Sequence, residues 1–142
     1  MPAAQRSIVI AKPLKEVFGV IRDYESYPEF LPEVKAAHIA HRRGHEVHVQ
    51  YEIQMIRTIR YTLRQTEEPP NRISWTFVEG EVMRDNCGHW ELEEAGEGKT
   101  RATYTIEVKL GPLVPKSIVD ALVGGSLPKM LEAFKKRAES AT

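Results

Sequence analysis

Aromatic side chains recur through the middle of the sequence, and most of them also carry a hydrogen-bonding group. They stand at alternate positions of apolar segments: Tyr51, Tyr61, Trp75, Phe77, Trp90 and Tyr104. Tyrosine and tryptophan bury a ring and still offer one hydrogen bond, and small-molecule pockets are lined mainly by apolar and aromatic side chains. These six side chains together could bind a flat or chain-like apolar ligand. For any one of these residues, ordinary core packing is the competing interpretation.

Asn86 is the polar residue best placed to join the aromatic set. If its strand is regular, Asn86 shares a face with Arg84 and Trp90 and can donate to a ligand carbonyl. A bulge at Asp85 and Asn86 would instead leave both residues in solvent. Gly88 stands on the same face and would leave room for a helix or a ligand to approach.

The histidines do not have the spacing of a metal site. The sequence contains His38, His41, His45, His48 and His89. Residues three apart on a strand point to opposite faces, so neither the pair 38 and 41 nor the pair 45 and 48 converges, and no cysteine joins them. We therefore predict no metal ion and no cofactor.

No residue pattern indicates covalent or acid–base catalysis. The sequence has no Gly-x-Ser-x-Gly motif, and Cys87 stands alone. Glu91 and Glu93 share a strand face with His89, but alternation places that face opposite Trp90 and therefore in solvent. We predict no catalytic residue, and a binding protein is favoured over an enzyme.

Length, charge and cysteine content narrow the class of protein. The 142 residues suit one domain spanning 1–142, and 20 Lys plus Arg balance 20 Asp plus Glu. That balance disfavours nucleic acid as a partner, although Arg42, Arg43, Arg57, Arg60 and Arg64 could form a local patch. Acidic neighbours such as Glu67 could pair with them across strands. A single cysteine and the absence of a signal-like apolar run predict a cytoplasmic protein, whose membrane contact, if any, is peripheral or through a partner protein.

The elements that must position these residues follow from hydrophobic spacing. Arg6 to Ala11 predicts a short strand, and Leu14 to Tyr24 predicts a helix that starts after Pro13 and buries one face. Two prolines between Tyr27 and Pro32 leave room for at most one helical turn, so a compact, partly buried corner is expected there.

Six closely spaced strands and one long helix complete the prediction. The strands are expected at 34–41, at 45–56, through 59–63, through 73–77, at 83–94 and at 100–110. Their short connections favour an antiparallel meander, because parallel strands need long crossovers. Pro115 to Ala138 predicts an amphipathic helix that covers the sheet, either continuous or interrupted at Gly124 and Gly125.

Two sequence motifs carry a family resemblance. Ala11 to Phe18 (AKPLKEVF) and Asp23 to Pro32 (DYESYPEFLP) resemble the START and Bet v 1-like (SRPBCC) superfamily of polyketide cyclase/dehydrase type. The second motif, with Val78-Glu79-Gly80 and Gly88-His89-Trp90, is similar to the coenzyme Q-binding and ribosome-associated toxin branch. The resemblance implies an α+β helix-grip fold, in which a curved antiparallel sheet of about seven strands wraps around a long C-terminal helix.

The resemblance also implies a function. It suggests that a hydrophobic small molecule, of the lipid or isoprenoid quinone class, is bound or transported in a cavity between the sheet and the C-terminal helix. The residues expected to line that cavity are Tyr51, Ile53, Tyr61, Trp75, Phe77, Asn86, Trp90, Tyr104, Ile106, Ile118, Leu122, Leu127 and Met130. Two alternatives remain open at this point: an interaction protein acting on the ribosome or a respiratory complex, and a polyketide cyclase or dehydratase-like enzyme.

Overall fold

The computed structural model describes residues 3–54, 57–120 and 127–140 of the chain. Its elements are β1 (Ala3–Ile10), α1 (Leu14–Ile21), the 3₁₀ helix η1 (Tyr24–Glu29), β2 (Val34–Arg43), β3 (Glu46–Gln54), β4 (Thr58–Glu68), β5 (Arg72–Gly80), β6 (Met83–Glu94), β7 (Thr100–Leu110), α2 (Lys116–Asp120) and α3 (Leu127–Ser140). The predicted α+β class and the order of its elements are confirmed.

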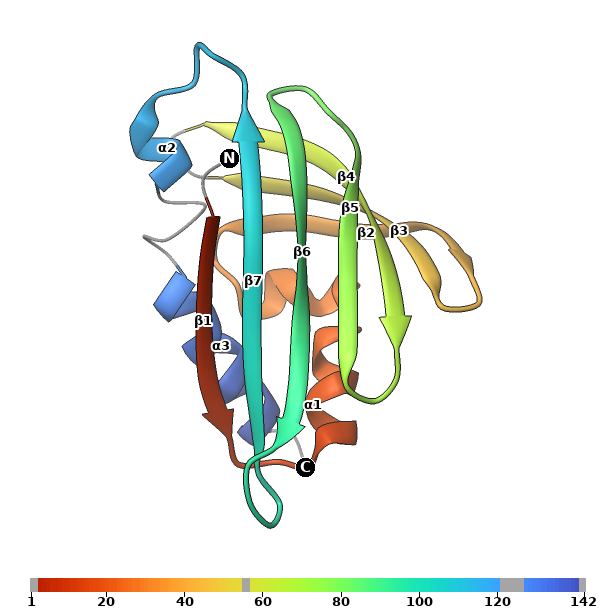
Figure 1. Ribbon diagram of the computed structural model, residues 1–142. Helices are drawn as coiled ribbons and strands as arrows, with labels where there is room; N and C mark the ends of the chain where they lie inside the picture. The colour runs from red at the N-terminus through yellow and green to blue at the C-terminus, as the bar shows by residue number, and fades with distance from the viewer. Residues whose placement is uncertain (1–2, 55–56, 121–126, 141–142) are drawn as a thin grey trace.

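The seven strands form one antiparallel sheet in the order β1-β7-β6-β5-β4-β3-β2. Strands β2 to β7 are the predicted meander, and β1 joins the far edge by pairing with β7. The sheet curves, and α1, η1 and α3 all lie on its inner side (Figure 1). This arrangement is the predicted helix-grip fold.

The alternating pattern of β3 shows why the sheet buries one face. Val47, Val49, Tyr51 and Ile53 are buried, whereas the residues between them are half-buried or exposed. Burying one such side chain stabilises the fold by about 1.5–3 kcal/mol relative to leaving it in water. The period of two therefore sets which face of each strand turns toward the helices.

The N-terminal boundaries differ from the prediction. The helix α1 ends at Ile21 instead of continuing to Tyr24, and η1 then runs to Glu29 with Pro28 inside it. The predicted single turn of the corner is thus a longer 3₁₀ helix that starts earlier. Strand β1 begins at Ala3, because backbone pairing with β7 extends it beyond its apolar residues.

The corner packs onto the core as expected. Tyr27 and Leu31 are buried, and the half-buried Phe30 packs against the same cluster. The Tyr27 hydroxyl donates to the Ile21 carbonyl oxygen over 2.6 Å, which satisfies a backbone acceptor at the end of α1. The corner is therefore tied to the helix that precedes it.

The predicted C-terminal helix corresponds to α2 and α3 in the described residues. Pro128 falls in the first turn of α3, where its missing N–H breaks no helical hydrogen bond. The predicted interruption at Gly124 and Gly125 lies outside the described residues. Near its C-terminal end, α3 is fixed by Arg137, which donates to Glu29 over 2.8 Å and lies 5.2 Å from the centroid of the Phe30 ring.

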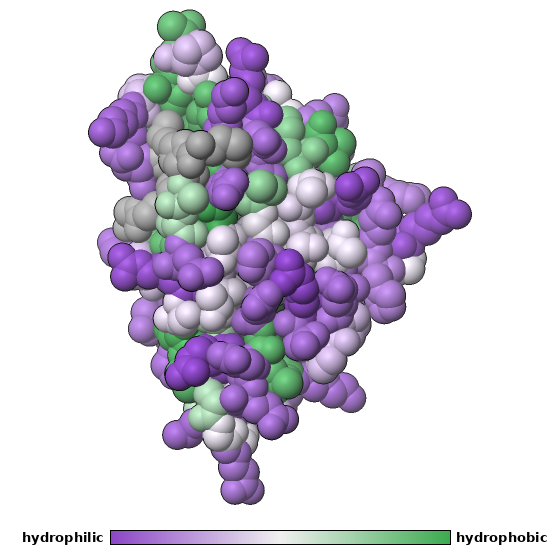
Figure 2. All heavy atoms as spheres, viewed as in Figure 1, coloured by the Kyte–Doolittle hydropathy of each residue, from purple (hydrophilic) through white to green (hydrophobic). Residues whose placement is uncertain are grey.

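The outer face of the sheet is largely hydrophilic (Figure 2). Basic residues on it pair with acidic ones on neighbouring strands. Cross-strand ion pairs include Arg60 with Glu52 at 2.9 Å and Arg101 with Glu93 at 3.6 Å. Such exposed pairs stabilise a fold by about 0–1 kcal/mol each. Leu113, in the loop between β7 and α2, is 94% exposed. No helix in the described ranges is long and apolar enough to cross a bilayer.

Candidate functional site

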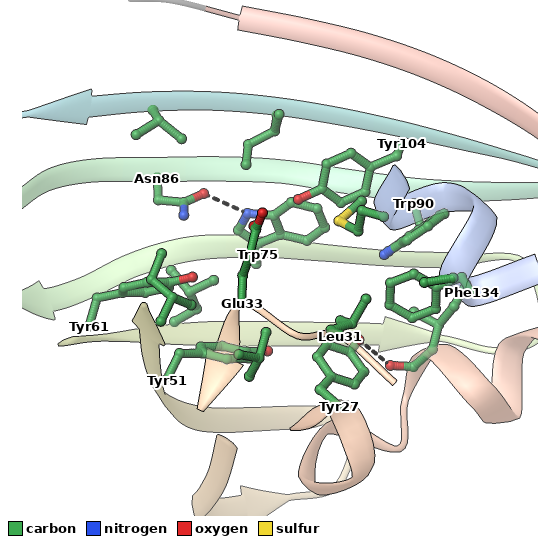
Figure 3. A pocket seen from close by; sticks show the side chains of 18 of the residues that line it. Tyr27, Leu31, Glu33, Tyr51, Tyr61, Trp75, Asn86, Trp90, Tyr104 and Phe134 are labelled. Atoms are coloured by element: carbon green, nitrogen blue, oxygen red, sulfur yellow. Dashed lines mark hydrogen bonds between the residues drawn. The ribbon is translucent and has the colours of Figure 1, made fainter. Parts of the chain in front are cut away.

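A cavity of about 270 Å³ lies between the inner face of the sheet, η1 and α3 (Figure 3). Its wall is mainly apolar and aromatic. It consists of Ile21, Tyr27, Leu31, Pro32, Glu33, Val34, Tyr51, Ile53, Tyr61, Leu63, Gln65, Trp75, Asn86, Trp90, Tyr104, Ile106, Val108, Lys129, Met130, Ala133 and Phe134.

Most of the residues predicted to line a cavity stand in this wall. These are Tyr51, Ile53, Tyr61, Trp75, Asn86, Trp90, Tyr104, Ile106 and Met130. Phe77, Ile118 and Leu127 do not. Ile118 packs in a separate cluster with Ile53 and Ile59, Phe77 packs half-buried against the main core, and Leu127 is buried at the start of α3. Leu122 lies outside the described residues.

Three wall residues are exposed and mark the mouth of the cavity: Pro32, Glu33 and Lys129. The first two precede β2 and the third lies near the start of α3, so the cavity opens between these segments. Figure 3 shows the Glu33 side chain directed inward. Glu33 and Lys129 are the two charged residues of the described wall, and both lie at its entrance.

The aromatic rings of the wall form one connected series, in which Tyr27 and Phe134 join Tyr51 to Trp90. Tyr51 and Tyr61 stack across β3 and β4 with ring centroids 5.4 Å apart. On the other side, Tyr104 lies 5.3 Å from Trp75 and 4.8 Å from Trp90 between ring centroids. Aromatic pairs at these separations add about 0.5–1.5 kcal/mol each beyond their buried area, so the rings stabilise one another's positions in the wall.

Asn86 is buried and belongs to the wall. The Trp75 indole N–H donates to Asn86 Oδ1 over 2.9 Å, and Asn86 Nδ2 lies 3.5 Å from the Met83 sulfur. A register shift between Met83 and Asp85 buries Met83 and turns Arg84 outward. The expectation that Arg84 shares the inner face was therefore wrong, as was the expectation that a bulge would expose Asn86. The irregularity ends before Asn86, which stays in phase with Trp90.

Gly88 makes room for an indole ring instead of for a helix or a ligand. A Cβ atom at this position would lie 2.7 Å from Trp75 Cζ2 and 2.1 Å from the Thr105 carbonyl oxygen. Any other residue would displace the indole or separate β6 from β7. Gly88 thus sets the position of Trp75, and with it one wall of the cavity.

Several wall residues were not predicted from the sequence. Gln65 continues the alternation of Ile59, Tyr61 and Leu63, so its inward direction could have been predicted; it donates to the Tyr51 hydroxyl over 3.0 Å. Tyr27 and Phe134 come from η1 and α3, and strand periodicity contains no information about them. Only the tertiary packing brings them to the sheet.

Glu67 continues the same inward alternation and is 2% exposed. The predicted pairing of Glu67 with an arginine of the patch does form, with Arg42, but it is buried. The Glu67 carboxylate accepts from Tyr24 over 2.8 Å, from Arg42 over 3.0 Å and from Arg22 over 3.1 Å. Burial alone would raise the pKa of Glu67, but the hydrogen bonds from Arg42, Tyr24 and Arg22 lower it overall. This cluster ties β4 to α1, η1 and β2, beside the cavity.

The histidines do not gather into a metal site. His41 and His48 are cross-strand neighbours with ring centroids 5.8 Å apart. Within the described part of the chain, no three side chains of His, Cys, Asp or Glu are placed to hold a metal ion. Cys87 is half-buried beside Glu107. Its burial, and to a smaller extent the negative charges of Glu107 and Asp85, raise the pKa of the Cys87 thiol, which disfavours the reactive thiolate.

Known proteins share this architecture. The chain is 27% identical over 139 residues to the ribosome association toxin RatA of Pseudomonas aeruginosa, covering 95% of this chain and 94% of that protein. The aromatase/cyclase Zhui of Streptomyces sp. R1128 superposes with a TM-score of 0.86 at 16% identity, over 96% of this chain and 93% of its own. A START superfamily protein of Mycobacterium smegmatis superposes with a TM-score of 0.86 at 18% identity, over 99% of both chains.

At such identities the superpositions show the fold alone. A family model gives the stronger assignment: residues 10–135 fit the model described as "polyketide cyclase / dehydrase and lipid transport". That range includes every element from α1 to most of α3 and the whole described wall of the cavity. The chain therefore belongs to the polyketide cyclase/dehydrase and lipid transport family.

Proposed function

We propose that this protein binds and carries a hydrophobic small molecule in the cavity between the sheet and α3. The observation that carries the proposal is the wall itself, in which aromatic and aliphatic side chains from the sheet, η1 and α3 enclose about 270 Å³ with both charged residues at the mouth. Apolar surface left facing water at this scale costs folding free energy that a ligand would recover. Lipids and isoprenoid quinones are the ligand classes that we favour.

Filling the cavity should weaken ligand binding without removing any polar group. Ala133 lies on α3 and lines the wall, so Ala133→Leu places three more carbon atoms in the cavity and suits a helix. We expect an apolar fluorescent probe to bind this variant at least about tenfold more weakly, because one or two lost apolar contacts correspond to about 1.4 kcal/mol. Fluorescence titration of purified protein measures the change.

The matched control is Ala40→Leu, at an exposed position of β2. It should bind the probe as the parent does. Native mass spectrometry of the protein purified from cells provides the second readout, in which a co-purifying apolar molecule should accompany the parent and Ala40→Leu but not Ala133→Leu. Equal probe affinity in the parent and in Ala133→Leu would contradict the carrier function.

A second candidate is interaction with the ribosome. It is supported by the resemblance to RatA over nearly the full length of both chains. We expect the protein to co-sediment with ribosomes through a sucrose cushion, and the association to weaken as salt rises if exposed basic side chains carry it. Sedimentation of the protein with and without ribosomes measures this. If all of it stays in the supernatant at low salt, the candidate is wrong, and the cavity experiment is unaffected.

A further inference from the structure

Besides Lys129 at the mouth, three side chains of the cavity wall carry a hydrogen-bond donor but make no hydrogen bond at all with the described residues. The hydroxyls of Tyr61 and Tyr104 and the indole N–H of Trp90 make no hydrogen bond with the residues that the structure describes. In the same part of the chain, every enclosed side-chain nitrogen and oxygen does have a partner. The three unpartnered groups must therefore border open space, and the open space that these residues share is the cavity.

Apart from Glu33 and Lys129 at the mouth, the other polar side chains of the described wall take part in hydrogen bonds, although the Tyr51 hydroxyl only accepts and has no acceptor for its own proton among the described residues. Trp75 donates to Asn86, Gln65 donates to Tyr51, and Tyr27 donates to the Ile21 carbonyl oxygen. The wall could have satisfied Tyr61 and Tyr104 in the same way, or replaced them by phenylalanine at no loss of packing. Water that enters through the mouth can meet such a donor, but a ligand acceptor atom that replaces this water keeps the hydrogen bond and adds apolar contact with the wall.

The chemistry of the three unpartnered groups indicates which atoms a ligand should carry. An indole N–H only donates, and a phenol hydroxyl donates at least as well as it accepts, so the matching atom is an acceptor oxygen. Figure 3 shows Tyr61 entering from one side of the cavity and Tyr104 from another. A ligand that serves both donors carries acceptor oxygens at two separate points, with apolar surface between them.

The ligand must also be neutral where it is enclosed. Burial raises the pKa of Tyr61, and burial, followed by the charge that an ionised Tyr61 would carry, raises the pKa of Tyr104, so both stay protonated donors at neutral pH. The same loss of solvation penalises a ligand carboxylate or phosphate. The cation that could offset it, Lys129, lies at the mouth, away from the enclosed part of the wall.

We infer that the cavity selects a neutral ring compound with two carbonyl oxygens, held by the hydroxyls of Tyr61 and Tyr104. The flat aromatic walls formed by Tyr51 with Tyr61 and by Trp75 with Tyr104 suit the faces of fused rings. This inference rests on the proposed carrier function and narrows its ligand class. It disfavours fatty acids, whose charge would have no partner inside.

A pair of probes with nearly the same shape tests this selection. Anthraquinone carries two carbonyl oxygens on a flat three-ring frame, and anthracene lacks both. We expect the parent protein to bind anthraquinone more than about tenfold more tightly than anthracene, because two neutral hydrogen bonds contribute about 0.5–1.5 kcal/mol each. Anthracene-9-carboxylate should bind more weakly than either. Titration followed by intrinsic tryptophan fluorescence gives the three affinities.

Tyrosine variants assign the preference to its donors. Tyr61→Phe and Tyr104→Phe should each weaken anthraquinone binding about fivefold and leave anthracene binding unchanged, and the double variant should lose the preference. Tyr27→Phe is the matched control, since Tyr27 also lines the cavity but its hydroxyl is bound to Ile21. It should keep the full preference for anthraquinone.

The outcomes separate the inference from the function on which it rests. If both neutral probes bind the parent equally, or if the double variant keeps the preference, the selection by Tyr61 and Tyr104 is wrong while the carrier function stands. If neither probe binds the parent, the cavity does not take up ring compounds of this size and the inference is overturned, whereas the carrier function is still decided by the apolar fluorescent probe and Ala133→Leu.

Discussion

Gly88→Ala is expected to lower the free energy of unfolding by about 3 kcal/mol, which is the upper range for forcing extra atoms into a packed interior. The added Cβ would lie 2.1 Å from the Thr105 carbonyl oxygen, which is backbone of the neighbouring strand and cannot rotate away. It would also lie 2.7 Å from Trp75 Cζ2. Either β6 and β7 separate locally or the indole leaves its hydrogen bond with Asn86.

Urea unfolding followed by far-UV circular dichroism measures this loss, and tryptophan fluorescence reports the displacement of the indole. The chain offers a matched control in Gly19→Ala. Gly19 lies within α1, and a Cβ there would meet no atom within 4 Å. The same substitution should therefore stabilise the protein by up to about 1 kcal/mol, since alanine is the better helix former. A Gly88→Ala variant as stable as the parent would show that Trp75 does not pack against Gly88.

Glu67→Gln is expected to destabilise the protein by about 2 kcal/mol at neutral pH. Removing one partner of a buried ion pair commonly costs about 3–5 kcal/mol, and we reduce that figure because Arg22 and Arg42 are 44% and 33% exposed and can turn to water. Glutamine keeps an acceptor for Tyr24 but loses the charge that both arginines share. Chemical unfolding of the parent and the variant measures the difference.

The pH dependence gives a second test of the same group. The pKa of Glu67 is lowered in the folded state, so its contribution to stability is fully present above the unfolded value of about 4.3 and disappears as pH falls through the folded value. The difference between the parent and Glu67→Gln should therefore shrink below about pH 5. A difference that stays constant down to about pH 3 would mean that the charge of Glu67 does not stabilise the fold.

Glu52→Gln is the control for Glu67→Gln. Glu52 pairs with Arg60 over 2.9 Å on the outer face of the sheet, and the side chains of Glu52 and Arg60 are 36% and 56% exposed. Double-mutant measurements on such pairs give about 0–1 kcal/mol, so this variant should unfold close to the parent at every pH. A loss equal to that of Glu67→Gln would remove the distinction between buried and surface ion pairs in this sheet.

The strands and the inward direction of most cavity residues were determined by the sequence alone. Alternation is a local property of a half-buried strand, so the spacing of Tyr51, Tyr61, Trp75 and Trp90 is sufficient to place them on one face. The same rule applied one step further would have placed Gln65 and Glu67 inside as well, because they continue the β4 pattern.

The rest was decided by tertiary contacts. The register shift near Met83 depends on how β6 pairs with β7, and it determines that Asn86 faces the cavity while Arg84 does not. Gly88 faces the Trp75 indole because β5 lies beside β6, a neighbour relation that strand periodicity does not contain. Tyr27 in η1 and Phe134 in α3 are far apart in the chain, yet their rings contact each other in the cavity wall. They are buried there only after the strands that separate them in the sequence have folded into the sheet.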